Sequence, residues 1–357
     1  MDKKMAGNRI NIDELVRPNI RDLSPYRSAR DDFDSGLLLD ANENAFGSPF
    51  DGSLQLNRYP SPTQDPLRKR VAAFRGVDHE NIFLGVGSDE PIDLLIRIFC
   101  KPGEDAILIT PPTYGMYKVS ARINDVAVKS VLLDESLQPD PDAILSKADA
   151  RTKILFLCSP NNPTGNFLER ERMIRLIGQF PGIVVLDEAY IDFSSEKSAA
   201  GLVEKYPNLV VLQTLSKSFG MAGVRLGIAI ADVAVIRYMM KVKAPYNINK
   251  LTADTALQAF DKLGQIQATI EKVIAERKRL AKALSGMKAV RKVFPSDANF
   301  LLFRIDDALE VYRELASRGV IIRYRGNEPR CEDCLRVTVG MPEENERFLS
   351  TLKQVLP

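Results

Sequence analysis

The chain is poor in the side chains that many enzymes use. Its 357 residues include one histidine, no tryptophan and four cysteines. A Ser-His-Asp triad or a histidine-rich metal site needs imidazole groups, so the single histidine, His79, argues against both kinds of chemistry. Four cysteines are too few for a disulfide scaffold in a chain of this length. Reactive groups must therefore come from other side chains or from a cofactor.

The one C-x-x-C pair, Cys331 and Cys334, has no second pair to complete a metal site. A structural zinc ion needs four ligands, and His79 is far away in the sequence. We therefore expect two thiols in a polar loop and no bound metal.

An excess of charge and long apolar runs are also absent. The 49 Lys+Arg and 47 Asp+Glu residues leave a net charge of +2, which argues against nucleic acid or an anionic membrane as a partner. No run is long enough to span a bilayer, and the N-terminal MDKKMAGNRINIDEL has no apolar core of the signal-peptide kind. These absences predict a cytoplasmic protein.

Between residues 80 and 230, short apolar runs alternate with amphipathic stretches. Apolar runs without polar alternation are typical of parallel strands covered by helices on both faces. The expected strands are 106–110, 153–158, 182–187, 209–214 and 224–230. Residues 89–100 and 168–180 repeat apolar side chains at helical spacing. The pattern predicts an α/β fold with a mostly parallel sheet between helices.

The pattern changes after residue 262. We expect helices at 264–285, 307–318 and from 342, and strands at 299–305, 319–323 and 335–339. This predicts three parts. Residues 1–50 form an N-terminal arm and part of a small domain, residues 51–262 form a large domain, and residues 263–357 form a small α+β domain.

The segment TLSKSFGMAGVRLG (214–227) gathers side chains suited to an aldehyde and a phosphate. Lys217 has an amine that can form a Schiff base if it is partly desolvated and close to other cations. Thr214, Ser216 and Arg225 supply two hydroxyls and a permanent positive charge. A lysine in such a loop is, taken alone, more often an ordinary surface residue.

Two earlier segments place polar groups after buried strands. CSPNNPTGN contains Asn162, and VVLDEAYIDF contains Asp187 and Tyr190. A carboxylate at the end of so apolar a strand is costly unless it pairs with a cation. In isolation, an ordinary polar turn would explain Asn162 equally well, and a turn-capping role is the more common one for a residue such as Asp187.

The segment GVGSDEPIDLLI places Gly87, Ser88 and Asp89 at a predicted helix N-terminus, where free N–H groups favour a phosphate. Simple capping of the helix by Ser88 or Asp89 is the alternative. Tyr114 in PPTYGMY follows a strand and is suited to stacking on a planar ring, or to a place in the core.

Together, GSDE, PPTYGMY, SPNNPTG, VVLDEAY and TLSKSFGMAGVRLG resemble the pyridoxal-phosphate aminotransferases of the aspartate-aminotransferase fold, over essentially the whole chain. The resemblance implies pyridoxal 5'-phosphate as cofactor, carried on Lys217, which would also move the proton. It implies that Asp187 keeps the ring nitrogen protonated. The other cofactor contacts that it implies are Gly87, Ser88, Asp89, Tyr114, Asn162, Tyr190, Thr214, Ser216 and Arg225.

The segments RPNIRDLSPYRSAR, LLLDANENAFGSP, NRYPSP, GVIIRYRG and CLRVTVG are similar to those of the histidinol-phosphate aminotransferases within that family. This implies histidinol phosphate and 2-oxoglutarate or glutamate as substrates. It also implies a homodimer in which Tyr59 reaches the cofactor phosphate of the neighbouring subunit. The substrate contacts that it implies are Tyr26, Asn42, Arg323 and Arg336.

Three rival functions stay open at this point. An aromatic-amino-acid aminotransferase and a phosphothreonine decarboxylase share the cofactor and the fold. A transcription regulator built on an aminotransferase-like body needs a DNA-binding module, for which the first 50 residues and the near-zero net charge leave little room.

Overall fold

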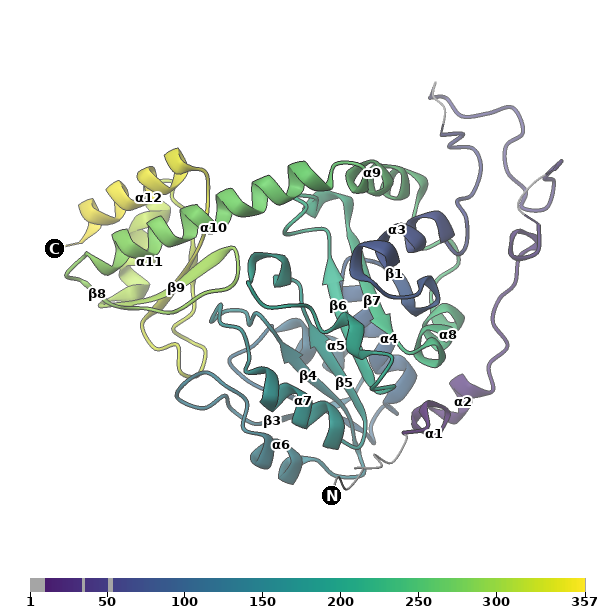
Figure 1. The fold of residues 1–357 in the computed structure, drawn as a ribbon, viewed down its shortest axis with the longest axis horizontal. Helices are drawn as coiled ribbons and strands as arrows, with labels where there is room; N and C mark the ends of the chain where they lie inside the picture. Colours follow the sequence, from purple (N-terminus) through teal and green to yellow (C-terminus); the bar gives the residue numbers. More distant parts are fainter. Residues whose placement is uncertain (1–9, 34–35, 51–53, 357) are drawn as a thin grey trace, which may run out of the picture.

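The computed structural model describes residues 10–33, 36–50 and 54–356. Residues 1–9, 34–35, 51–53 and 357 lie outside the described part, and so do the corresponding pieces of the expected arm and of the two domains. The described chain forms a large unit around a seven-stranded sheet and a smaller unit around a four-stranded sheet. An N-terminal segment runs along the outside of the large unit, on the side away from the small unit (Figure 1).

The large sheet has the strand order β1-β7-β6-β5-β4-β2-β3. Its strands are β1 (Ile82–Val86), β2 (Ala106–Ile109), β3 (Ala127–Ser130), β4 (Thr152–Cys158), β5 (Ile183–Asp187), β6 (Leu209–Thr214) and β7 (Leu226–Ala231). β7 is antiparallel to both of its neighbours, β1 and β6, and the remaining pairs are parallel. The carboxyl ends of β2, β4, β5 and β6 therefore meet at one edge of the sheet.

Helices cover both faces of this sheet. In β4, Leu155 and Leu157 belong to one apolar core, while Ile154 and Phe156 belong to the core on the opposite face. The first face packs against α3 (Asp65–Arg75), α6 (Pro141–Lys147), α7 (Arg170–Gln179) and α9 (Lys250–Phe260). The second face packs against α4 (Asp89–Phe99), α5 (Met116–Ile123) and α8 (Val233–Val242). Burial on both faces explains why these strands are apolar without alternation.

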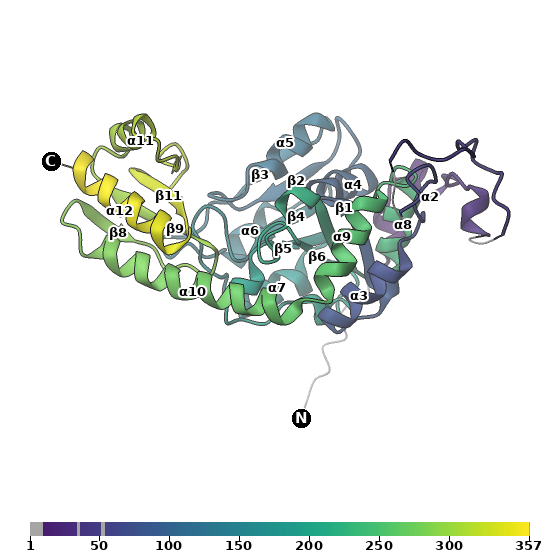
Figure 2. The same cartoon turned by 90° about the horizontal axis from the view of Figure 1, so that it is seen from above.

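The small unit is an antiparallel sheet with the order β10-β11-β9-β8, packed against helices. Its strands are β8 (Val290–Val293), β9 (Phe300–Ile305), β10 (Arg323–Tyr324) and β11 (Cys334–Thr338). Its helices are α10 (Leu263–Ser285), α11 (Ala308–Ser317) and α12 (Pro342–Val355). The long helix α10 extends from α9 in the large unit to the small unit (Figure 1, Figure 2). No helix within the described ranges is long and apolar enough to cross a membrane.

The fold predicted from the sequence is correct, although strands β1 and β3 of the large unit were not predicted and one strand of the small unit has other bounds. The strand expected at 319–323 is wrong over its first part, because these residues still close helix α11. The Val320 N–H donates to the Leu315 carbonyl at 2.9 Å, and Gly319 has a φ of +75°. The strand itself begins only at Arg323. The domain boundaries at residues 50 and 262 stay a prediction.

The N-terminal segment begins on the large unit and then leaves it (Figure 1). Its short helices are α1 (Ile12–Leu15) and α2 (Pro18–Arg21), and a 3-10 turn, η1, spans Ala29–Asp31. Ile12 and Val16 are buried in the core shared with α8. Further on, large side chains face outward, with Tyr26 72% and Phe46 103% exposed. So many exposed apolar groups on one segment mark an interaction surface.

Candidate active site

A pocket lies at the carboxyl ends of the parallel strands, where five of the predicted segments come together. Its lining residues are Ser88, Asp89, Tyr114, Cys158, Asn162, Asp187, Ala189, Tyr190, Thr214, Ser216, Lys217, Ala222 and Arg225. The loops after β1, β2, β4, β5 and β6 each contribute. In open α/β sheets this edge is where ligands bind. All predicted cofactor-binding residues except Gly87 and Tyr59 line this pocket.

Asp187 is a buried carboxylate at the end of β5, with 3% of its surface exposed. It accepts hydrogen bonds from the Tyr117 hydroxyl at 2.7 Å and from the Ala189 N–H at 3.1 Å. Burial raises the pKa of the Asp187 carboxyl, and these two hydrogen bonds offset part of that effect. No lysine or arginine of the described chain forms an ion pair with it. The carboxylate therefore favours a ligand that brings a positive charge.

Lys217 lies in the loop between β6 and β7, and its side chain lines the same pocket. Its Nζ atom is 5.8 Å from the centre of the Tyr190 ring. Burial, together with the positive charges of Arg336 and Arg225, lowers the pKa of the Lys217 ammonium. A larger fraction of this lysine is then the neutral amine, which is the nucleophilic form.

The far end of the pocket is built by the close approach of β1 and β7. Gly87 has a φ of +67°, and its N–H donates to the Arg225 carbonyl at 2.8 Å. A Cβ atom on Gly87 would lie 2.4 Å from Nη2 of Arg225. Glycine at this position thus leaves the space in which the Arg225 guanidinium lies.

The N-terminus of α4 points its first turn at this end of the pocket. Ser88 precedes the helix, and its side chain makes no capping hydrogen bond. The capping role that the sequence left open for Ser88 is therefore not observed. The Asp89 carboxylate lies 3.5 Å from the Arg225 guanidinium and accepts a hydrogen bond from the Tyr114 hydroxyl at 3.2 Å. Because a carboxylate repels a phosphate, Asp89 can only serve one through its backbone N–H.

Thr214 and Ser216 complete this end. The Ser216 N–H donates to Thr214 Oγ1 at 3.1 Å, and the Thr214 hydroxyl donates to the Leu226 carbonyl at 2.9 Å. The two hydroxyls, a guanidinium and a helix N-terminus form an arrangement suited to a phosphate.

At the other end, the small unit contacts Asn162 in the lining of the pocket. Arg336 of β11 donates from Nη1 to Asn162 Oδ1, and the Asn162 amide lies 3.4 Å from the Tyr190 hydroxyl. The Arg336 guanidinium lies 5.0 Å above the Phe300 ring. Burial and the neighbouring charges of Arg325 and Arg323 lower the pKa of Arg336 to about 10. Because other positive charges lie close to it, the Arg336 guanidinium favours the binding of an anion.

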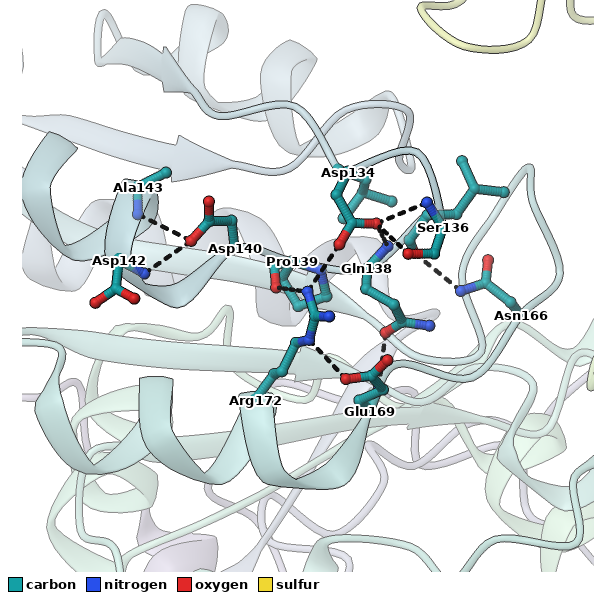
Figure 3. A network of polar contacts seen from close by, with 12 residues as sticks. Asp134, Ser136, Gln138, Pro139, Asp140, Asp142, Ala143, Asn166, Glu169 and Arg172 are labelled. Atoms are coloured by element: carbon teal, nitrogen blue, oxygen red, sulfur yellow. Dashed lines mark hydrogen bonds and ion pairs between the residues drawn. The ribbon is translucent and has the colours of Figure 1, made fainter.

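Polar contacts join the segment after β3 to the turn after β4, which carries Asn162 (Figure 3). Asn166 Nδ2 donates to the Leu137 carbonyl at 3.0 Å, and the Glu169 N–H donates to Gln138 Oε1 at 2.8 Å. An ion pair between Arg172 and Asp134, at 2.8 Å, joins the same two segments. These contacts tie the segment after β3 to the turn after β4, and so hold Asn162 in place.

Three predicted residues lie elsewhere in the chain. Tyr26 lines a cavity of ≈ 510 Å³ between the N-terminal segment and α8, and Asn42 lines a separate groove beside Lys250. Tyr59 stacks on Tyr246 with ring centres 4.7 Å apart. The fourth substrate residue, Arg323, sits directly opposite Arg336 in the β10–β11 pair. A single copy of the chain thus pairs Arg323 with Arg336, which contacts Asn162 at the pocket's edge, and leaves Tyr26, Asn42 and Tyr59 away from the pocket.

Reasoning from the sequence missed Tyr117, the donor to Asp187. A signal was present, because Tyr117 belongs to the same PPTYGMY segment as Tyr114.

The expected polar environment of Cys331 and Cys334 is wrong. Both thiols are fully buried in an apolar cluster with Leu133, Leu137, Phe294 and Leu302, because the loop closes over the junction of the two units. Burial raises the pKa of Cys331 to about 12. No group of metal ligands occurs within the described residues.

The comparisons with known proteins agree with this geometry. The model of the family "Aminotransferase class I and II" matches residues 41–352. The chain belongs to this family. Among its relatives, the histidinol-phosphate aminotransferase of Parabacteroides distasonis is 46% identical over 347 residues, which is 97% of this chain and 99% of the relative.

Solved structures of this aminotransferase family share the fold. The histidinol-phosphate aminotransferase of Clostridium acetobutylicum is 27% identical with a TM-score of 0.78, covering 84% of this chain and 91% of that chain. The enzyme of the same name from Sinorhizobium meliloti, solved in complex with pyridoxal-5'-phosphate, is 19% identical with a TM-score of 0.78, covering 88% and 90%. The mostly parallel large sheet and the smaller α+β unit predicted from the sequence are thereby confirmed.

The approach of Gly87 to Arg225 gives a first prediction. A Gly87→Ala variant places a methyl group in the space of the guanidinium and in a backbone region that alanine avoids, at a cost of about 1 kcal/mol for the backbone alone. We expect inorganic phosphate and phosphate-bearing ligands to bind about tenfold more weakly, measured by titration calorimetry. A Gly115→Ala variant, where a Cβ meets nothing within 4 Å, is the matched control. Equal phosphate binding by the two variants would contradict this role of Gly87 and Arg225.

Proposed function

We propose that the protein is a pyridoxal-phosphate-dependent histidinol-phosphate aminotransferase. It would transfer the amino group of L-histidinol phosphate to 2-oxoglutarate, giving imidazole-acetol phosphate and L-glutamate. The observation that carries the proposal is that Lys217 and Asp187 line one pocket, and that Arg336 donates a hydrogen bond to Asn162 in the lining of the same pocket. Similarity to histidinol-phosphate aminotransferases along nearly the whole chain supports the choice of substrate.

The residues of the pocket fit pyridoxal phosphate. The buried carboxylate of Asp187, which has no cationic partner in the described chain, matches a protonated ring nitrogen. Asn162 and Tyr190 lie together where a ring hydroxyl needs partners. The residues that would hold the phosphate are Ser88, Asp89 through its N–H, Thr214, Ser216 and Arg225. When bound, the cofactor supplies the electron sink that makes the Cα proton of an amine acidic.

The chain's own residues would bind, orient and move one proton. Lys217, with its lowered pKa, would attach the cofactor covalently, and its freed Nζ would take the Cα proton and return it to the cofactor carbon. Asp187 would hold the positive charge that keeps the ring electron-poor. Tyr117 would fix the Asp187 carboxylate by its hydrogen bond at 2.7 Å. Tyr114 would cover one face of the ring.

The two substrates differ in their anionic groups, and one pocket must accept both. L-Histidinol phosphate carries a phosphate and no carboxylate, whereas glutamate and 2-oxoglutarate carry carboxylates and no phosphate. Arginine makes two parallel hydrogen bonds to either group. Arg336 and Arg323, opposite each other on adjacent strands, would serve this end of the substrate.

A substrate panel tests the proposal against its rivals. Glutamate formation from 2-oxoglutarate is measured with L-histidinol phosphate and with L-phenylalanine, and carbon dioxide release is measured with phosphothreonine. We expect histidinol phosphate to have the highest kcat/KM for amine transfer and phosphothreonine to release no carbon dioxide. A higher kcat/KM for phenylalanine would favour the aromatic rival, and carbon dioxide release would favour the decarboxylase.

We also propose that the protein acts as a homodimer in which Tyr59 reaches the neighbouring active site. Exposed apolar groups along the N-terminal segment support this arrangement. The segment is ordered around Glu43, whose 3%-exposed side chain pairs with Arg30 and Arg58 at 2.8 Å and accepts the Tyr59 N–H at 2.6 Å. Burial opposes these contacts, but together they lower the pKa of Glu43 to about 2. The cytoplasmic location stays a prediction.

Mixed dimers test the exchange of Tyr59. Lys217→Ala and Tyr59→Ala chains, each nearly inactive alone, are refolded or co-expressed together and separated by two affinity tags. If Tyr59 serves the partner's site, one site of the mixed dimer carries both changes and the other carries neither. We therefore expect the mixed dimer to have about half of the wild-type activity. Activity no higher than that of the parents would show that Tyr59 acts within its own chain.

A further inference from the structure

Arg325 lies beside the two arginines assigned to the substrate, on the same face of the small sheet. Arg323 pairs with Arg336, and Tyr324 pairs with Leu335. The Arg325 N–H donates to the Cys334 carbonyl at 2.9 Å, so the ladder continues by one residue. Side chains directly opposite in an antiparallel pair share a face, and every second residue returns to that face. Arg323, Arg325 and Arg336 therefore line one face of β10 and β11.

This face meets the lining of the active-site pocket through Arg336. Arg336 reaches from it to Asn162, whose amide contacts Tyr190. Arg325 is half-buried and lies two residues along the strand edge from Arg323, the direct partner of Arg336. Arg325 is thus close to the groups that the anionic end of the substrate would meet. The resemblance to the family implies no role for Arg325.

The three arginines have little negative charge to balance them. Glu328, 3.4 Å from Nη1 of Arg325, is the only carboxylate of the described chain within ion-pair distance of any of the three. Three positive charges against one negative charge leave a surplus of two. In addition, Nε of Arg325 is buried with no hydrogen-bond partner in the part of the chain that the structure describes. A buried donor without a partner is costly, and an anion bound at this face would relieve the cost.

We propose that Arg325 is a third guanidinium of the substrate's anion subsite and sets its preference for a dianionic phosphate over a carboxylate. This inference rests on the function proposed above. A surplus of two positive charges matches a phosphate dianion, and without Arg325 the surplus falls to one, which suits a single carboxylate. Loss of Arg325 therefore weakens the binding of the phosphate-bearing substrate more than the binding of the oxo acid.

The test measures the two half-reactions of the cofactor-loaded enzyme separately. For Arg325→Gln, we expect the KM for L-histidinol phosphate to rise about 10- to 100-fold, the worth of one hydrogen bond to a charged group. We expect the KM for 2-oxoglutarate and both kcat values to change less than about threefold. Arg325→Lys, which keeps the charge, should recover most of the loss. Arg330→Gln is the matched control, because Arg330 lies on the same loop and binds the Leu133 carbonyl at 2.6 Å.

Glu328→Gln removes the one negative charge beside the three arginines, so it raises the positive surplus that Arg325→Gln lowers. It is expected to lower the KM for L-histidinol phosphate by about two- to fivefold. An unchanged ratio of the two KM values in Arg325→Gln, an equal change in Arg330→Gln, or no decrease in Glu328→Gln would overturn the inference. If the proposed function itself were wrong, the wild-type enzyme would not transfer the amine of histidinol phosphate at all, so the two failures are distinguishable.

Discussion

Replacing Lys217 by alanine is expected to reduce amine transfer by at least about 10⁴-fold, because the same nitrogen holds the cofactor and moves the proton. Lys217 lines the pocket between Asp187 and Arg225, and its pKa is lowered by burial and by Arg336 and Arg225. Within the described residues, it is the only lysine that lines this pocket. Glutamate formation from 2-oxoglutarate measures the loss.

Two further measurements separate chemistry from folding in this variant. Borohydride reduction followed by mass spectrometry should leave the cofactor on the peptide that contains residue 217 in the wild type, and on no peptide in Lys217→Ala. Lys217→Arg keeps the positive charge but not a neutral amine, so it should be as inactive as the alanine variant. Turnover near the wild-type rate in either variant would contradict the assigned role.

Replacing Asp187 by asparagine is expected to lower kcat/KM by about 10²- to 10³-fold while the fold persists. The amide has the shape of the carboxylate and can still accept the Tyr117 hydroxyl, but it brings no charge to the ring nitrogen. Tyr117→Phe is the matched control, because it keeps the charge and removes only one hydrogen bond at 2.7 Å. We expect Tyr117→Phe to lose no more than about tenfold. A larger loss for Tyr117→Phe than for Asp187→Asn would contradict this division of roles.

The same substitution should act in the opposite direction on the stability of the cofactor-free protein. Burial raises the pKa of Asp187 above its ordinary value of 3.8. A raised pKa in the folded state gives stability that is fully present below the ordinary value and is lost as the pH rises through the folded-state value. Asp187→Asn has no charge to lose. The melting temperature of the cofactor-free wild type should therefore fall relative to the variant as the pH rises from about 4 to 8.

Saturating cofactor checks the cause of this pH effect. A bound cation compensates the buried charge, so the wild type should regain its stability relative to Asp187→Asn at pH 8 when the cofactor is present. If the cofactor-free wild type were the more stable of the two at every pH, Asp187 would not be an uncompensated buried charge.

The sequence alone was sufficient for the large unit because local and long-range signals agree there. The five predicted strands are apolar on both faces, β5 and β6 end in Asp187 and Thr214, and polar residues follow directly after β4. Since the carboxyl ends of parallel strands meet at one edge, Asn162, Asp187 and Lys217 converge although they are far apart in the chain. Three strands were not predicted: β3 and β8, which are partly exposed and carry charged residues, and β1, which is apolar and mostly buried.

The rest of the site depends on contacts that no local pattern encodes. The sequence indicates only a core aromatic at Tyr117, whereas the structure places its hydroxyl against Asp187. The sequence indicates only a loop residue at Arg325, whereas the register of β10 and β11 places it on the same face of the sheet as Arg336. Tyr26, Asn42 and Tyr59 lie outside the pocket of their own chain, so a role for them at an active site stays a prediction that the proposed homodimer would explain.

The most direct test of the account is a single turnover of the cofactor-loaded enzyme with L-histidinol phosphate and no oxo acid. The cofactor's absorbance is followed while the product is identified by mass spectrometry. We predict rapid conversion of the cofactor to its amine form, with one equivalent of imidazole-acetol phosphate per chain and full reversal on addition of 2-oxoglutarate. No conversion with histidinol phosphate, while L-phenylalanine converts the cofactor rapidly, would contradict the proposed substrate.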